Sequence, residues 1–460
     1  MGRVITGSIS VSEKQCPFSY DATTEKLTFY LGGKGISVPT NTVCYVGQQY
    51  GLMNGGSYLF KLELPLSNSC LGFVDGHPIQ YSLTDQIGSV EYYIENYEVG
   101  SRYKEMRLSF PELDYFVPSC SRVTVSEDKW SFSRAKDVVL EFSIKYRDTD
   151  VSVTFETKAS CNAGMRVIAE TLSEVVLCFP ETDDLDYLQG LYEAARAFFV
   201  FICNRKNIGL RSATLIGEYP TKRLHDGRIL DAVGRGTQIV HYSQKYYEEE
   251  DAAKIKYTIR NNLLAANLPQ LFQMFSEKTI GEMAMINCSS IHHSIKYRNL
   301  IDLEQSLHIT ASFEYYVRTF LPEISSKITM EFFADLENLL DGYIGGLTGK
   351  KKKKAESFKK SLRPQLSLSE KMKKAYEGYS EWLPLKPILV EWFGEDITDL
   401  AESANTWRNE LAHEKREFSP DAKVVSAVRL VEHMNYCIVL RKAGYDDDQI
   451  KAIITEILVR

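Results

Sequence analysis

The sequence has few of the features that mark a secreted or membrane-spanning protein. Its nine cysteines are scattered and none forms a C-x-x-C pair, which is typical of reduced thiols and not of a disulfide framework. No apolar run approaches the roughly eighteen residues that a membrane-spanning helix needs. The N-terminus also lacks the charged and then apolar order of a signal peptide. We therefore expect a soluble cytoplasmic protein with no membrane partner.

Motifs for the common cofactor and metal chemistries are also missing. The sequence contains no glycine-rich phosphate loop, no G-x-S-x-G and no H-E-x-x-H, so nucleotide hydrolysis, serine hydrolysis and zinc proteolysis have no support. Cys288, His292 and His293 are close in sequence, but no second Cys or His pair stands at a zinc-site spacing. We expect these histidines to be exposed or paired within the fold, and we predict no metal and no cofactor.

Positive charge is scarce except in one segment. The formal net charge is -7, which excludes a generally basic nucleic-acid-binding chain and leaves only a local patch. Between Lys350 and Lys374 there are eleven basic residues against two acidic ones, beginning with five consecutive lysines (Lys350, Lys351, Lys352, Lys353 and Lys354). A solvated loop and an RNA phosphate-binding patch are equally weighted interpretations of this lysine-rich segment.

The first half of the chain alternates with a period of two. Residues 58–64 and 140–146 place apolar side chains on one side and polar ones on the other, which predicts an antiparallel sheet or sandwich. One helix is predicted over about 182–204, with Thr182 as its N-cap. We therefore predict a β-rich N-terminal recognition or sensor domain over residues 1–250.

From about residue 252 the apolar spacing becomes helical. A connector with one helix is predicted over 251–297, followed by an all-α bundle over 298–460. The predicted helices in the bundle include a stripe from Leu300 to Val317, segments at about 326–340 and 397–414, and a helix starting at Ser419-Pro420-Asp421. The 460 residues exceed one compact core, so the predicted fold class is α+β with separate β-rich and helical domains.

The predicted bundle contains one concentration of groups suited to acid–base chemistry. Arg408, Asn409 and His413 fall within two helical turns. An arginine can hold a phosphate, and a histidine can transfer protons near neutral pH. By itself this spacing is loose, because Arg235 and His241, which are six residues apart, form a similar arginine–histidine pair. Glu314 interrupts the predicted apolar stripe of an earlier helix, and a carboxylate there needs a cationic partner such as Arg408.

In the helical context the motif Arg-Asn-x-x-Ala-His resembles that of HEPN-domain ribonucleases. The whole chain is similar to the ApeA-like anti-phage proteins, in which a β-rich domain precedes a HEPN domain. The resemblance implies a metal-independent endoribonuclease that acts in abortive infection. Its substrate would be RNA, and the family suggests transfer RNA. It also implies a homodimer or higher oligomer formed through the HEPN domain. Glu414 departs from the family pattern, where glycine often follows the histidine.

The residues suggest how such a site would work. In RNA the 2′-hydroxyl is the nucleophile, so His413 would act as general acid and base, and Arg408 would stabilise the phosphate. Asn409 and His413 share a helical face, whereas Arg408 and His413 lie about 140° apart on a regular helix. Two copies pairing about a two-fold axis would remove this difficulty.

Regulation by the N-terminal domain and a phage-derived trigger are further expectations. The alternative function is a non-catalytic HEPN module that binds a nucleotide or a protein.

Overall fold

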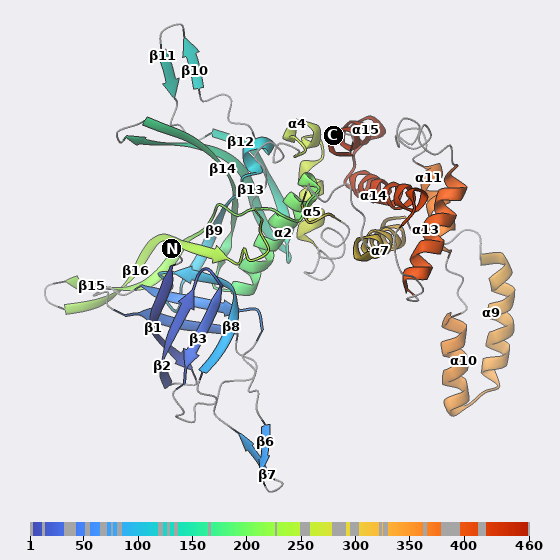
Figure 1. The fold of residues 1–460 in the computed structure, drawn as a ribbon, viewed down its shortest axis with the longest axis horizontal. Helices are drawn as coiled ribbons and strands as arrows, with labels where there is room; N and C mark the ends of the chain where they lie inside the picture. The colour runs from blue at the N-terminus through green and yellow to red at the C-terminus, as the bar shows by residue number, and fades with distance from the viewer. Residues whose placement is uncertain are drawn as a thin grey trace. The chain divides into compact units, whose positions relative to one another are not determined.

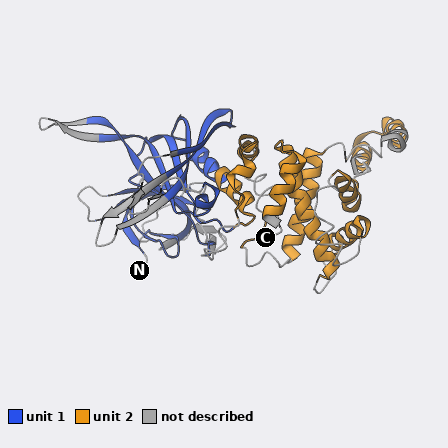
Figure 2. Ribbon diagram, turned by 90° about the horizontal axis from the view of Figure 1, so that it is seen from above, with its two compact units in different colours: residues 1–193, 207–256 blue, residues 194–206, 257–460 orange. Residues whose placement is uncertain are grey.

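A computed structural model describes most of the chain, which divides into two compact units. The described residues are 3–11, 14–31, 43–50, 56–64, 71–74, 77–80, 85–117, 123–126, 129–132, 137–163, 167–225, 228–248, 258–277, 291–294, 303–321, 324, 330–361, 366–378, 396–412 and 420–458. Unit 1 comprises Met1–Glu193 and Asn207–Lys256, and unit 2 comprises Ala194–Lys206 and Tyr257–Arg460 (Figure 2). The predicted α+β class, with an antiparallel β-rich N-terminal part and helices after it, is confirmed.

Six strands of unit 1 close into an antiparallel barrel. They are β1 (Val4–Val11), β2 (Lys14–Asp21), β3 (Lys26–Tyr30), β4 (Cys44–Gln49), β5 (Ser57–Leu62) and β8 (Asp85–Glu95). The hydrogen-bonded order β8-β3-β2-β1-β4-β5 returns to β8, because β5 also pairs with β8. The sequence predicted an antiparallel sheet or a sandwich, and it did not predict closure into a barrel. A closed barrel leaves its six strands without the unpaired edges of an open sheet.

Aromatic side chains fill the barrel, and glycines make room for them. Phe18, Tyr20, Phe60 and Tyr93 belong to the buried barrel core, with ring centroids 5.0 to 5.8 Å apart in the contacts among them. The Phe18 ring lies against Gly7, where an added Cβ would be 2.7 Å from its Cε1 atom. The same Cβ would lie only 1.9 Å from the carbonyl oxygen of Gln48, so glycine is required at this position because neither the backbone of the neighbouring strand nor the packed ring leaves room for a side chain.

The strands outside the barrel extend from β8 as an open sheet. They are β16 (Arg228–Tyr242), β15 (Ser212–His225), β9 (Arg102–Ser109), β14 (Val167–Thr182), β13 (Thr149–Ala163) and β12 (Asp137–Tyr146), in that order. The described part of the chain adds the hairpins β6 (Leu71–Val74)–β7 (His77–Gln80) and β10 (Val123–Ser126)–β11 (Lys129–Phe132), together with the short helix α1 (Leu113–Phe116) (Figure 1). Alternation in β12 and β13 agrees with the predicted period of two.

The long helix α2 (Leu185–Cys203) begins in unit 1 and is capped by Asp184. Asp184 Oδ1 accepts hydrogen bonds from the backbone N–H groups of Asp186 and Tyr187, at 2.9 and 3.1 Å. The prediction that Thr182 is the N-cap is wrong, because Thr182 lies three residues before Leu185 and its hydroxyl accepts a hydrogen bond from the Asp184 N–H. The carboxylate of Asp184 reaches the orphan donors of the first turn, which Thr182 is too far away to satisfy.

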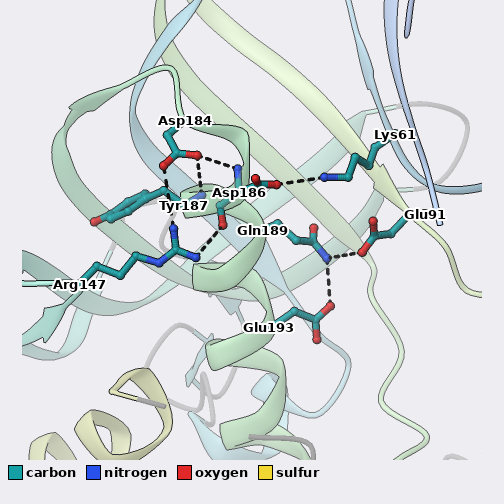
Figure 3. Close-up of polar contacts among 8 residues, drawn as sticks. All are labelled: Lys61, Glu91, Arg147, Asp184, Asp186, Tyr187, Gln189 and Glu193. Carbon is teal, nitrogen blue, oxygen red and sulfur yellow. Dashed lines mark hydrogen bonds and ion pairs between the residues drawn. The ribbon is translucent and has the colours of Figure 1, made fainter. Parts of the chain in front are cut away.

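Polar contacts fix the first turns of α2 within unit 1 (Figure 3). Lys61 of β5 donates to Asp186 Oδ1 at 3.0 Å, and Gln189 donates to Glu91 Oε1 of β8 at 3.1 Å. Burial raises the pKa of Glu91 above its ordinary value. The barrel wall and the start of α2 are therefore joined by two side-chain hydrogen bonds, one of which is also an ion pair between Lys61 and Asp186.

The end of α2 belongs to the helical unit. The Phe201 ring stacks on Tyr436 with centroids 4.6 Å apart, and the Tyr436 hydroxyl donates to the Phe201 carbonyl at 2.9 Å. The same hydroxyl lies 2.9 Å from Asn204 Oδ1, and Asn204 takes a positive φ of 48° directly after the helix. Residues 194–206 thus share the core of unit 2 although they precede strands β15 and β16 in sequence.

Unit 2 is built from helices throughout its described residues. They are α4 (Asn261–Leu264), α5 (Leu268–Ser276), α7 (Leu303–Phe320), α9 (Met330–Gly345), α10 (Gly349–Ser361), α11 (Leu368–Glu377), α13 (Ile397–Ala412), α14 (Ala422–Lys442) and α15 (Asp447–Leu458). In the described part of the chain, no helix is long and apolar enough to cross a membrane.

Several predicted helix boundaries need correction. The single helix expected in the connector is two short ones, α4 and α5. The N-cap of α14 is Asp421, whose Oδ1 accepts from the Val424 N–H at 2.8 Å, so the prediction of a start at Ser419 is two residues early. The predicted stop at Gly444 is confirmed, since Gly444 has a φ of +95° directly after the C-cap residue of α14, a conformation that glycine adopts without strain.

Candidate active site in the helical unit

One carboxylate joins three helices of unit 2. Glu314 of α7 accepts a hydrogen bond from Lys371 Nζ of α11 at 3.0 Å through Oε1, and another from Arg408 Nη2 of α13 at 3.1 Å through Oε2. The predicted pairing of Glu314 with Arg408 is confirmed. Because each oxygen of the carboxylate has its own cationic donor, the three side chains hold one another in a fixed arrangement.

Helix α7 presents Glu314 at the edge of its buried face. The buried positions include Ser306, Ile309, Phe313 and Val317, which recur at helical spacing. The predicted stripe through Leu303, Leu307, Ala311 and Glu314 is wrong, since these residues are only partly buried. The small residue Ser306 is buried instead, which favours close packing of α7 against its neighbours. Helix α14 lies on this side of α7, since the side chain of Asn435 donates to the Ile309 carbonyl at 3.2 Å. Glu314 is therefore accessible from solvent, with 27% of its side chain exposed.

Helix α11 positions Lys371, a residue that the sequence did not single out. The helix begins with a capping box, in which the Ser367 hydroxyl accepts from the Glu370 N–H and the Glu370 carboxylate accepts from the Ser367 N–H. These hydrogen bonds lower the pKa of Glu370 below its ordinary value. Ser-x-x-Glu is visible in the sequence as a helix start. It predicts where α11 begins, but not that Lys371 turns inward with 11% of its side chain exposed.

Helix α13 carries Arg408 and Asn409 beside a buried anchor. Trp407 is 2% exposed and Ala404 is fully buried, so their face of α13 packs inward. Arg408 follows Trp407 and lies at the border of this face, with 39% of its side chain exposed. Its Nη1 donates to Asn409 Oδ1 at 3.3 Å. The fold thus brings together Arg408, Asn409 and Glu314 from the predicted site, whereas the predicted His413 lies outside the described residues.

The charges of this cluster leave it positive. Glu314 would neutralise Arg408 in a simple pair, but Lys371 supplies a second positive charge to the same carboxylate. Lys371 is too buried to present its ammonium group to a large ligand, whereas Arg408 is partly exposed. The cluster therefore combines a fixed position for the Arg408 guanidinium with a net attraction for an anion such as a phosphate.

Another face of α13 has the opposite charge. A pocket of about 290 Å³ is lined by acidic residues of α13 and by the start of α14, among them Asp399, Glu402, Glu410 and Asp421, with Lys423 as a basic exception. Like charges repel a phosphate there. A phosphate anion is therefore favoured on the Arg408 side of α13 and not in this pocket.

The candidate metal residues have other roles or fall outside the description. Cys288 lies outside the described residues. The buried His292 has its Nε2 atom 2.8 Å from Arg429 Nη1, and Arg429 also donates to Glu432 at 2.7 Å. Burial of Glu432 alone would raise its pKa, but Arg429 and His292 hold that pKa below its ordinary value. Within the described ranges, no group of three or more Cys, His, Asp or Glu side chains is arranged to hold a metal.

The lysine run is helical and not a loop. Lys350, Lys351, Lys352, Lys353 and Lys354 occupy the first turns of α10, and all five are exposed. The interpretation as a solvated loop followed from the general behaviour of charge runs, and it is wrong about the secondary structure. Lysine is nevertheless a good helix former, and α10 packs beside α9.

Comparison with protein families identifies the helical region. Residues 307–449 match the family Apea-like HEPN. This region is an Apea-like HEPN domain. The match begins within α7 and ends within α15, so it includes Glu314, the five lysines, Lys371, Arg408, Asn409 and His413. The resemblance inferred from the Arg-Asn-x-x-Ala-His motif is confirmed by this match. Comparisons with curated proteins and with solved structures found no match.

The bridging geometry predicts a measurable coupling between Lys371 and Glu314. In a double-mutant cycle of Lys371→Met and Glu314→Gln, we expect a coupling free energy of unfolding of about 1 kcal/mol, because both groups are largely withdrawn from water. Thermal or urea unfolding of the four proteins measures it. The control cycle is Lys373→Met with Glu402→Gln, a pair 3.3 Å apart that joins the same helix, α11, to α13 but is more exposed. This control should show about half that value or less. Equal coupling in the two cycles would contradict the proposed rigidity of the Glu314 cluster.

Proposed function

We propose that the chain is a metal-independent endoribonuclease of an anti-phage defence system. The observation that carries the proposal is the partly exposed Arg408, held by Glu314 beside Asn409 within an Apea-like HEPN domain. A fixed guanidinium with free donors is suited to bind a phosphate and to stabilise the charge that develops on it. The proposed family function then accounts for why these polar groups lie together at the surface of a helical bundle.

In the proposed reaction the substrate supplies its own nucleophile. The 2′-oxygen of one ribose attacks the adjacent phosphorus, the bond to the 5′-oxygen of the next nucleotide breaks, and a 2′,3′-cyclic phosphate and a 5′-hydroxyl are formed. His413 is proposed to take the proton from the 2′-hydroxyl and to return one to the leaving 5′-oxygen. Arg408 is proposed to stabilise the extra negative charge of the intermediate phosphorane. Asn409 is proposed to orient the phosphate or the imidazole.

The substrate and its control are proposed from the family. Transfer RNA is the proposed RNA, the proposed trigger is a phage product, and the β-rich N-terminal region is proposed to regulate the HEPN domain. The acidic pocket on the other face of α13 supports an approach of the substrate from the Arg408 side, because it would repel a polyanion.

Removal of either proposed catalytic group should stop RNA cleavage. We expect Arg408→Ala and His413→Ala to lower the cleavage rate by about 100-fold or more, measured by sequencing RNA ends after induced expression and by cleavage with purified protein. His308→Ala and Arg318→Ala are matched controls, because they remove the same kinds of group from α7 of the same domain, and both should retain activity. If Arg408→Ala and His413→Ala leave RNA cleavage and growth arrest unchanged, the domain is instead a non-catalytic binding module.

We also propose that two HEPN domains pair and pool their motifs. On one regular helix Arg408 and His413 point about 140° apart, and a two-fold axis lets Arg408 of one subunit work with His413 of the other. Mixing the inactive Arg408→Ala and His413→Ala proteins should then restore roughly a quarter of wild-type activity, since half of the dimers would be mixed and each would contain one intact site. No recovery in dimers shown to have exchanged subunits would mean that each site is formed within one subunit.

A further inference from the structure

Helices α9 and α10 form a hairpin with strongly unequal charge. The two helices contact each other (Figure 1), and Lys359 of α10 makes an ion pair with Asp341 of α9. Helix α10 contains seven lysines and one glutamate. Because the chain turns back after Gly345, Lys350–Lys354 lie at the connected end of the hairpin, whereas the Asp341–Lys359 pair lies further along it. Asp341 therefore offsets a lysine outside the run of five.

The lysine run is placed where it opposes helix formation. Lys350–Lys354 occupy the N-terminal turns of α10, and the helix dipole disfavours cations at that end. Lys350 and Lys354 are also four residues apart, a spacing at which like charges repel. A bound polyanion would relieve both costs. This charge arrangement is thus better explained by an anionic ligand than by solvation alone.

Exposed aromatic rings accompany the lysines. Phe358 of α10 is 57% exposed and Tyr343 of α9 is 64% exposed. Phe358 follows Lys354 by four residues, so the two share a helical face. Lysines next to exposed aromatic rings are the combination with which proteins hold single-stranded nucleic acid, since the cations bind phosphates and the rings stack on bases.

We propose that this hairpin, defined as the basic arm (residues 330–361), is an RNA-binding surface that holds unpaired nucleotides of the substrate through their phosphates and bases. This proposal rests on the proposed function in one respect only, namely that the bound RNA is the RNA that the protein cleaves. In this arrangement Lys350–Lys354 bind the backbone without sequence preference, and Phe358 stacks on a base. The basic arm then contributes to binding the RNA, and Arg408 and His413 act on the bond that is cleaved.

Salt dependence of binding tests the lysines. The probe is a fluorescein-labelled uridine homopolymer, bound to the full chain carrying His413→Ala, with log affinity measured against log salt concentration. Replacing all five lysines of the run with Gln should lower the slope by about three and the affinity at low salt by about tenfold or more, because phosphate contacts release counterions. The matched control replaces Lys14, Lys26, Lys104, Lys145 and Lys451, which are all exposed and lie outside the arm. It has the same net charge and should retain the slope of the parent protein.

The aromatic contact has a different signature. Phe358→Ala should weaken binding roughly tenfold at every salt concentration without changing the slope, because base stacking releases few ions. If the five-Gln variant and its control have equal slopes of log affinity against log salt concentration, the proposal that the basic arm binds RNA is overturned. So would arm-dependent binding to phosphatidylserine vesicles without binding to the uridine homopolymer. These binding results are separate from catalysis. Loss of cleavage in Arg408→Ala with an intact arm supports the proposed nuclease function. If the protein binds RNA through the arm but never cleaves it, the nuclease proposal is overturned and the binding proposal stands.

Discussion

The two hydrogen bonds to the Glu314 carboxylate are the constraint on which the candidate site depends. They join α7, α11 and α13 through one side chain. Without Lys371, Glu314 and Arg408 would form a neutral pair with little attraction for a phosphate. Without Glu314, Arg408 would lose its fixed position. Lys371 would then be a largely buried cation that has lost this counter-charge, which destabilises the fold. Position and positive charge are thus obtained together, and both are needed to stabilise a developing anion.

The helices behind this cluster explain how it stays in place. Helix α14 lies in the centre of unit 2, where most of its side chains are buried, and it contacts both α7 and α13. Tyr436 of α14 also bonds to Phe201 at the end of α2. The same helix therefore supports the face that carries Glu314 and anchors a segment that precedes the last two strands in sequence. Substitutions in α14 are expected to shift the positions of the site residues on α7 and α13, and not to remove a direct contact with substrate.

Much of this architecture could be predicted because its signals are local. The period of two in β12 and β13, the helical periods after residue 252, and the stop at Gly444 each depend on neighbouring residues. The pairing of Glu314 with Arg408 followed from the cost of a carboxylate near a buried face. Arg408 and Asn409 were identified from one short motif, and the match to Apea-like HEPN covers them. Their catalytic roles and that of His413 remain predictions.

The remaining features depend on contacts between distant segments or on competition among near neighbours. Closure of the barrel requires β5 to pair with β8 as well as with β4, which alternation alone cannot show. The inward turn of Lys371 depends on where α7 lies. Asp184 and Asp421 displaced the expected caps because their carboxylates reach the first free N–H groups. The lysine run forms a helix because α9 packs beside α10, a contact that its composition does not reveal.

The most direct test of the proposed chemistry uses an RNA with a single altered sugar. A 2′-deoxyribose is placed at the nucleotide whose 3′-phosphate is cleaved, and cleavage is measured in the presence of EDTA. The 2′-hydroxyl mechanism predicts 2′,3′-cyclic phosphate and 5′-hydroxyl ends from the unmodified RNA, and no cleavage at the altered position. Cleavage that persists at the 2′-deoxy position, or that stops when EDTA is added, would contradict a metal-independent reaction at Arg408 and His413.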